Sequence, residues 1–203
     1  MAGSARRRVI LELVLGMMAV TVMFAANVYA AQSAGQSPAP TSAVPTPVQS
    51  ADEAYRTGKQ FEGKQDYVAA MRWYRKAADQ GNALAQVAVG NLYGMAQGVA
   101  QDYGEALRWY RKAADQGNNE AEDNVGFFYL SGWGVTQDYA EALRWFRKAA
   151  DHANEVAERN IGMIYLQGLG VAQDRTEAIR WFRKAAAHGD AESKDALKQF
   201  DAR

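Results

Sequence analysis

The chain contains no cysteine and only two histidines among its 203 residues. The absence of cysteine excludes disulfide bonds, thiolate metal sites, cysteine nucleophiles and lipid attachment through a cysteine. The two histidines, His152 and His188, nearly exclude a histidine-rich zinc or iron site. The sequence therefore predicts no metal site, no catalytic residue of these kinds and no cofactor.

Proline is scarce and confined to one place. All four prolines lie between residues 38 and 47, in a stretch rich in glutamine, serine, alanine and threonine. Residues 31–50 have too little bulky apolar surface to fold, so we expect a semi-extended linker there. The 156 residues after Pro47 are free to form helices without that helix breaker.

The first thirty residues have the pattern of an export signal. Three arginines at positions 6 to 8 precede an apolar run from Leu13 to Ala26. Small residues at Val28 and Ala30 favour cleavage after Ala30, which makes residues 1–30 a signal peptide. An uncleaved membrane anchor is the alternative, because the run can be extended to nearly the ~20 residues that span a bilayer. In both cases the rest of the chain is expected outside the cytoplasm, in the periplasm, secreted or membrane-anchored.

Charge of one sign is not in excess. The chain has 23 Lys and Arg against 23 Asp and Glu. Removal of residues 1–30 takes away three arginines and one glutamate, which leaves 20 basic and 22 acidic residues and a net charge of −2. Together with export, this balance argues against a nucleic-acid partner.

One motif recurs four times at a spacing of 36 residues. The copies are RWYRKAADQGN at 72–82 and again at 108–118, RWFRKAADHAN at 144–154 and RWFRKAAAHGD at 180–190. Their tryptophans are Trp73, Trp109, Trp145 and Trp181. A period of this length indicates stacked helical units.

Each period predicts two helices. In the first, around 84–93, apolar residues share one face and Gly90 leaves room for close packing, with Ala106 as its expected neighbour. Asp102 followed by Glu105 predicts an N-cap with a reciprocal acidic partner, so the second helix begins there. Gly117 ends it.

We predict an all-α protein, a short right-handed α/α solenoid of about four helix-turn-helix hairpins with a C-terminal capping helix. Burial within one unit does not offset the entropy cost of ordering its backbone, so each unit must pack on its neighbours. The predicted units are a tetratricopeptide-like first hairpin at 51–82, repeats at 83–118, 119–154 and 155–190, and a capping helix at 191–203.

The recurring residues of one period are Gly90-x-x-Tyr93, Gly98-Val99, Asp102 and Ala106-x-x-Trp109-Tyr110-x-Lys112-Ala113-Ala114. This pattern, which holds three times over 83–190, resembles the Sel-one-like repeat, a subclass of the tetratricopeptide repeat superfamily. The resemblance implies a non-enzymatic adaptor that binds proteins, in bacteria often exported and tied to the cell envelope. Some exported relatives carry a cysteine pair in each repeat and are linked to β-lactam binding; this chain has no cysteine, so they are a poor guide to it.

The resemblance also implies where a partner protein or peptide binds, since the first helix of each pair lines the concave face of such solenoids. The outward positions on those helices are Tyr55, Lys59, Leu84, Val87, Asn91, Glu120, Asp123, Phe127, Ser131, Val156, Arg159, Met163 and Gln167. Asn124 and Asn160 can hydrogen-bond an extended peptide, or satisfy neighbouring helix and loop groups instead. Phe127 and Met163 are candidate apolar anchors, with simple core packing as the alternative.

Trp133 has no aromatic counterpart in the other repeats. It lies in a glycine-rich loop, where it either contacts a partner from the side or folds over its own hairpin. Gln80, Gln116, His152 and His188 share one position at the end of the second helix, so the histidines are interpreted as substitutions at a solvated position rather than as a metal pair.

The second helices offer an alternative function. Arg72, Arg75, Lys76 and their copies supply 12 of the 20 basic residues that follow residue 30. Stacked repeats would align them beside tryptophan and tyrosine as a ladder for an anionic envelope polymer. The other interpretation is a solvated face of cations near helix C-termini, paired with Glu105, Asp115 and their equivalents. A cell-wall-linked enzyme is the third class, but the sequence contains no recognisable catalytic motif.

Overall fold

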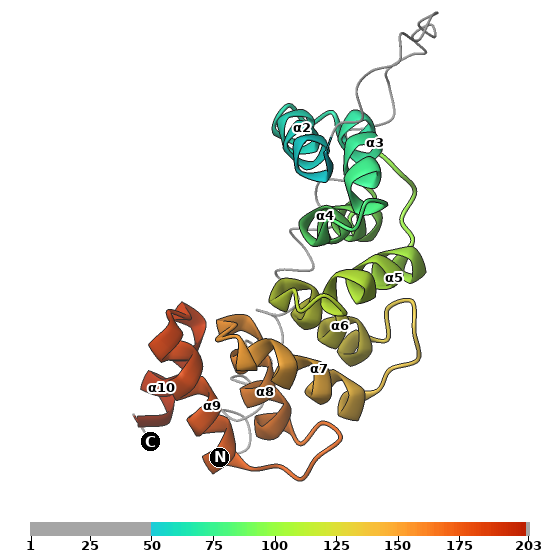
Figure 1. Cartoon of the computed structure of the whole chain (residues 1–203). Coiled ribbons are helices and arrows are strands. Elements are labelled where there is room, and N and C mark those ends of the chain that lie inside the picture. The colour runs from blue at the N-terminus through green and yellow to red at the C-terminus, as the bar shows by residue number, and fades with distance from the viewer. Residues whose placement is uncertain (1–49, 202–203) are drawn as a thin grey trace, which may run out of the picture. The chain divides into compact units, whose positions relative to one another are not determined.

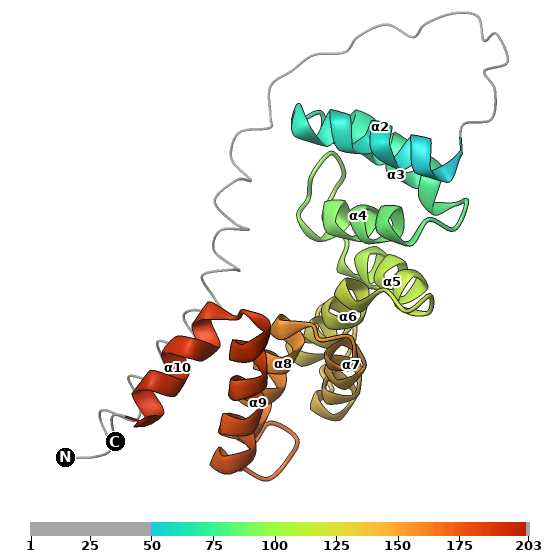
Figure 2. The ribbon, with the colours of Figure 1, turned by 60° about the vertical axis from the view of Figure 1, so that its left-hand side comes forward.

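The computed structural model describes residues 50–201, which are helical with short connections (Figures 1 and 2). The described helices are α2 (Ala51–Gly63), α3 (Tyr67–Ala78), α4 (Ala83–Gly94), α5 (Tyr103–Ala114), α6 (Asn119–Ser131), α7 (Tyr139–Asp151), α8 (Glu155–Gln167), α9 (Arg175–His188) and α10 (Ala191–Asp201). The predicted signal at 1–30 and nearly all of the predicted linker at 31–50 lie outside these residues.

The helices pack as consecutive hairpins. The extensive helix contacts are between chain neighbours, within the pairs α2–α3, α4–α5, α6–α7 and α8–α9 and between each pair and the next. Helix α10 packs on α9 and ends the row (Figure 2). This arrangement confirms the predicted all-α fold of four hairpins and a C-terminal helix, in which each unit is supported by its neighbours.

The core is shared between hairpins. One cluster joins Ala54 of α2, Tyr74 of α3, Leu92 of α4 and Trp109 of α5, all of them buried. The first two residues belong to the first hairpin and the last two to the second. Because burial crosses the boundary, one hairpin alone would leave much of this apolar surface in water.

The second helices α5, α7 and α9 begin at the aspartates that the sequence predicts as their N-caps. Asp102 Oδ1 accepts a hydrogen bond of 2.9 Å from the Glu105 N–H, and Asp138 and Asp174 cap α7 and α9 in the same way. These bonds satisfy donors that have no partner within the helix. The predicted reciprocal bond is wrong, because the backbone N–H of Asp102 donates to the Tyr93 carbonyl at 3.2 Å. The loop therefore closes against the end of α4.

The glycine that recurs in the first helices lies against an aromatic ring of the second helix. A Cβ atom added at Gly90 would lie 2.6 Å from Cε1 of Tyr110, so the atoms nearest to Gly90 belong to this ring and not to Ala106, the expected neighbour. Gly126 faces Phe146 and Gly162 faces Phe182 in the same way. The missing side chain lets a large ring of the second helix lie against the first helix's backbone.

A second set of glycines joins successive hairpins. Gly98 has φ of 71°, and an added Cβ atom would lie 2.5 Å from the backbone carbon of Tyr67 at the start of α3. Gly134 has φ of 65° and lies equally close to the backbone of Tyr103 at the start of α5. Each inter-helix loop therefore rests on the preceding hairpin, where only glycine fits the backbone conformation and the space.

Candidate interaction surface

The structure separates the predicted partner-binding residues by exposure. Lys59, Leu84 and Glu120 are exposed. Half-buried positions are Tyr55, Asn91, Asp123, Asn124, Phe127, Ser131, Val156, Arg159 and Gln167. Val87, Asn160 and Met163 are buried.

The expectation that Val87 and Met163 point outward is wrong. Val87 belongs to a core cluster with Tyr110 and Val125, which places its side chain between the second and third hairpins. Met163 is equally enclosed. Both side chains, which the single-helix pattern leaves outside, are thus buried, and at Val87 the next hairpin covers the side chain, so neither position offers a contact surface.

Phe127 and Trp133 form one aromatic cluster. Their ring centroids lie 5.2 Å apart in an edge-to-face arrangement, and Trp133 stacks on Tyr103 of the preceding hairpin at 4.7 Å. Phe128 meets the Trp133 ring edge-on at 5.8 Å. Trp133 thus packs over its own hairpin, as one of the two alternatives predicted, and also against the preceding hairpin. Both Phe127 and Trp133 keep part of their surface exposed.

Several polar residues of the first helices bind one another. Asn160 Nδ2 donates to Asp123 Oδ1 at 3.2 Å, which links α8 to α6. Burial raises the pKa of Asp123 to about 7, although the bond from Asn160 and the charge of Arg159 oppose the rise. Arg159 itself forms ion pairs with Asp190 and Glu192. Asn160 therefore hydrogen-bonds a neighbouring helix, which is the second of the two alternatives predicted for it.

The cations of the second helices are largely engaged within the chain. Arg75 and Arg147 donate to the hydroxyl groups of Tyr93 and Tyr165 at 3.0 and 2.8 Å, and Arg111 contacts Tyr129 equivalently. Lysines lie over the tryptophan rings three residues before them, with Lys112 3.9 Å from the Trp109 centroid and the equivalent lysines at 4.0 to 5.0 Å. Arg108, Arg144 and Arg180 pair with glutamates at 2.6 to 2.7 Å.

The arginine–tyrosine bonds were not predicted. Each joins a second helix to the first helix of the next hairpin, 18 residues further along the chain. The sequence does contain a signal for these bonds. The arginine and the tyrosine each recur every 36 residues, and the two are separated by 18 residues, which is half of that period. Helical periodicity alone does not reveal a contact between two separate helices.

The two histidines are exposed, as predicted for a solvated position, but each also faces a buried glutamate. His188 Nδ1 lies 2.8 Å from Glu158 Oε2, and His152 Nε2 lies 4.0 Å from Glu122 Oε2. The interpretation as solvated substitutions is therefore incomplete. Within residues 50–201, no three His, Cys, Asp or Glu side chains gather as a metal site requires.

The recurring caps, ring-facing glycines and arginine–tyrosine bonds define a protein built from one repeated helical hairpin. A sequence profile of the family described as Sel1 repeat matches residues 51–82, 83–118, 119–154 and 156–190. The chain therefore belongs to the Sel1 repeat family, which is the Sel-one-like repeat that its recurring residues resemble. Its first hairpin is matched as a Sel1 repeat like the others. Members of the family are repeat scaffolds and usually non-catalytic.

Solved structures agree with this assignment. A Sel1 repeat protein from Oxalobacter formigenes is 35% identical with a TM-score of 0.72, and the match covers 75% of this chain and 64% of that one. The protein c5321, a protective antigen of uropathogenic Escherichia coli with an SLR fold, is 38% identical with a TM-score of 0.69 over 72% of this chain and 32% of that one. Cysteine-rich protein B of Helicobacter pylori shares the fold at 21% identity and a TM-score of 0.51, over 64% of this chain and 94% of that one.

This chain spans less than two thirds of the length of the first two of these proteins. Among curated proteins, none matches it. In the part of the chain that the structure describes, no helix is both long and apolar enough to cross a membrane.

Proposed function

We propose that this Sel1 repeat protein is an exported, non-enzymatic scaffold that binds a partner protein or peptide of the cell envelope on the face of its first helices. The family supports the scaffold role. The arginines and apolar run of residues 1–30 support export, with cleavage after Ala30. No partner class finer than protein or peptide is implied.

One observation carries the choice of face. Leu84, on the first helix α4, keeps 49% of its surface exposed, and the half-buried Phe127 and Trp133 lie in the next repeat. An exposed leucine on one first helix and partly exposed aromatic rings in the next repeat are the kind of apolar anchors on which protein interfaces depend. The exposed Glu120 and Lys59 can orient a partner by charge.

The second helices support an anionic-polymer ligand less well. Their cations already contact tyrosine hydroxyls, tryptophan rings and glutamates within the chain. A polymer would have to compete with these partners. Binding through such cations would weaken steeply with added salt, so a salt titration separates this alternative from an apolar contact.

Capture from envelope extract tests the proposed face with a matched pair of variants. Leu84 on a first helix and Val68 on a second helix are similarly exposed, at 49% and 52%. We expect Leu84→Asp to lose a partner that the unchanged chain retains, while Val68→Asp keeps it. Equal capture by both variants, with unchanged helicity, would contradict the proposal that the first helices bind.

Export is tested separately. N-terminal sequencing of the protein recovered from fractionated cells is expected to begin at Ala31, in the envelope or the medium. Recovery of the intact N-terminus in the membrane fraction would support the anchor instead, and recovery from the cytoplasm would refute export.

A further inference from the structure

Three equivalent positions hold a polar side chain in the core. Gln86, Glu122 and Glu158 stand near the starts of α4, α6 and α8, 36 residues apart, and all three are buried. Each faces the side chain 30 residues later, at the end of the second helix of the same hairpin. We call these contacts the junction pairs: Gln86–Gln116, Glu122–His152 and Glu158–His188.

The two members of a junction pair change together. Where the first helix carries glutamine, the second helix also carries glutamine, and where it carries glutamate, the second helix carries histidine. A glutamine pair holds no ionisable group. A buried glutamate is costly when charged unless a cation or donor faces it, and histidine supplies either at accessible pH.

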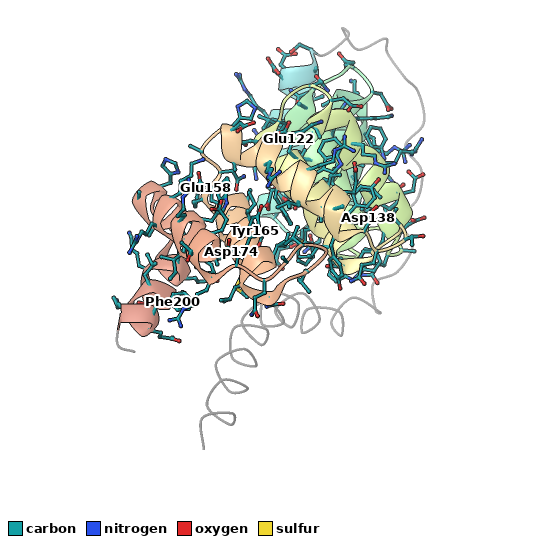
Figure 3. The ribbon with its side chains drawn as sticks, turned by 90° about the horizontal axis from the view of Figure 1, so that it is seen from below. Glu122, Asp138, Glu158, Tyr165, Asp174 and Phe200 are labelled. Atoms are coloured by element: carbon teal, nitrogen blue, oxygen red, sulfur yellow. The ribbon has the colours of Figure 1, made fainter. Side chains whose placement is uncertain are left out.

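The junction pairs lie where one hairpin meets the next. Gln86 accepts from Gln116 Nε2 at 2.7 Å and donates to the carbonyl of Ala78 at 3.2 Å, which joins α3, α4 and α5. Glu158 contacts His188 at 2.8 Å and Lys184 at 3.0 Å. Lys184 also lies 3.4 Å from the Ala150 carbonyl, so this pair joins α7, α8 and α9. Figure 3 shows Glu122 and Glu158 on the side of the repeats away from Asp138.

Glu122 is the least satisfied of the three side chains. Its Oε2 atom is buried without a hydrogen-bond partner, 4.0 Å from His152 Nε2. Burial raises the pKa of this carboxyl, while His152 and Lys148 oppose the rise and Asp151 adds to it. The charged groups that face Glu122 come from α7 and its C-cap, whereas those that contact Glu158 are Lys184 and His188 of α9.

We propose that the Glu122–His152 and Glu158–His188 pairs are proton-sensitive clasps that hold the third and fourth repeats more firmly below neutral pH, while Gln86–Gln116 holds the second repeat at all pH values. A proton on either histidine turns its contact into a charge-assisted interaction with a buried carboxylate. A proton on Glu122 removes a buried charge that lacks a hydrogen bond. Within the Glu122–His152 pair these gains are alternatives, because a protonated glutamate is no longer the carboxylate with which a charged imidazole pairs. One proton taken up by either member favours the folded junction.

The raised pKa of Glu122 determines how its contribution to folding stability changes with pH. Because the folded state raises the pKa of Glu122, the carboxyl's contribution to stability is complete below the ordinary carboxyl range. It is lost as pH rises through the raised value. The Glu122–His152 clasp therefore loosens toward alkaline pH, in the repeat that carries Asp123 and Phe127.

The test replaces each clasp by the pair that the chain itself uses in its second repeat. Glu122→Gln with His152→Gln, and Glu158→Gln with His188→Gln, are made in the full chain, singly and combined. Thermal unfolding is followed by circular dichroism at about pH 5.5 and about pH 8. We expect the rise in Tm from alkaline to acid pH to shrink by about 2–4 °C for each clasp removed. Asp123 is present in every variant, so its titration cancels in the comparison.

The converse variant, Gln86→Glu with Gln116→His, installs a clasp in the second repeat and is expected to enlarge the pH dependence. An unchanged pH dependence in the combined glutamine variant would overturn the proposal. Should the variants not fold, hydrogen exchange of the unchanged protein decides. After correction for intrinsic rates, amides of α6 to α9 are expected to gain more protection at acid pH than those of α4 and α5, and an equal gain would overturn it.

Discussion

At the scale of single residues, the fold depends on glycines, which have no side chain and so leave room for an aromatic ring of the neighbouring helix. Gly126 lies under the ring of Phe146, where an added Cβ atom would come within 2.8 Å of two ring carbons. Phe146 is fully buried, so its ring cannot move aside into solvent. Gly63, at the end of α2, has no atom within 4 Å of the same added position.

These surroundings predict opposite effects of one substitution. Gly126→Ala is expected to destabilise the protein by about 1–3 kcal/mol, because the extra methyl group forces the helices apart. Gly63→Ala should be neutral or stabilise by up to about 1 kcal/mol, because alanine restricts the unfolded chain and favours a helix. Urea unfolding of both variants measures the difference. Equal effects would mean that ring packing does not select the glycine.

Asp123 gives a pH dependence at the same scale. Burial raises its pKa to about 7, so its contribution to stability is complete below about pH 4 and is lost as pH rises through about 7. Asp123→Asn keeps a polar group beside Asn160 without the charge. We expect this variant to gain stability over the unchanged chain at alkaline pH and little or none under acid conditions. Denaturant midpoints across that range measure the change, and a pH-independent difference would contradict it.

At the scale of the element, each second helix depends on its cap. Asp138 Oδ1 accepts hydrogen bonds of 2.9 Å from the N–H groups of Ala140 and Glu141. Asp138→Ala leaves these donors to solvent and should cost about 1 kcal/mol of stability. Asp195→Ala is the control, since it removes an exposed ion pair with Lys198 and should change stability by less than about 0.5 kcal/mol. Equal midpoints in urea would show that the cap is dispensable.

At the scale of the whole repeat array, the effect of deleting a segment on stability depends on whether the segment is internal or at the end. Helix α10 covers the last hairpin, where Phe200 stacks on Phe182 at 6.0 Å and Asp190 accepts from the Ser193 N–H at 2.7 Å. An internal repeat such as 119–154 is bounded by equivalent asparagines, Asn118 and Asn154, which cap the following helices. Its removal therefore joins equivalent ends.

We expect deletion of 119–154 to leave a folded, helical protein with a urea m-value lower by about a quarter, because m scales with the surface exposed on unfolding. Deletion of 191–203 removes far fewer residues but exposes the apolar side of α9. It should lower Tm and promote association. Circular dichroism and light scattering distinguish the two. A soluble, fully stable protein without α10 would show that the last helix does not act as a cap.

The repeat period, the helices and their aspartate caps were predictable because local spacing and chain chemistry suffice to specify them. Each of the four repeated tryptophans has a lysine over its ring, as a stack of equal hairpins requires, although Trp109 is fully buried while Trp73, Trp145 and Trp181 are half-buried. The exposure of individual positions was less predictable. Leu84 is exposed as expected, but Val87, three residues later on the same helix, is buried by the next hairpin.

The number of hairpins, the start of each one and the residues that recur in them can all be read from the order of the amino acids. Three contacts became visible once the helices were packed together: Gly90 against Tyr110, Arg75 with Tyr93, and a glutamate in the core facing a histidine 30 residues away. These two kinds of feature differ because helix formation depends on residues that are close together in the sequence. Burial and pairing depend on which neighbouring helix covers a given side chain.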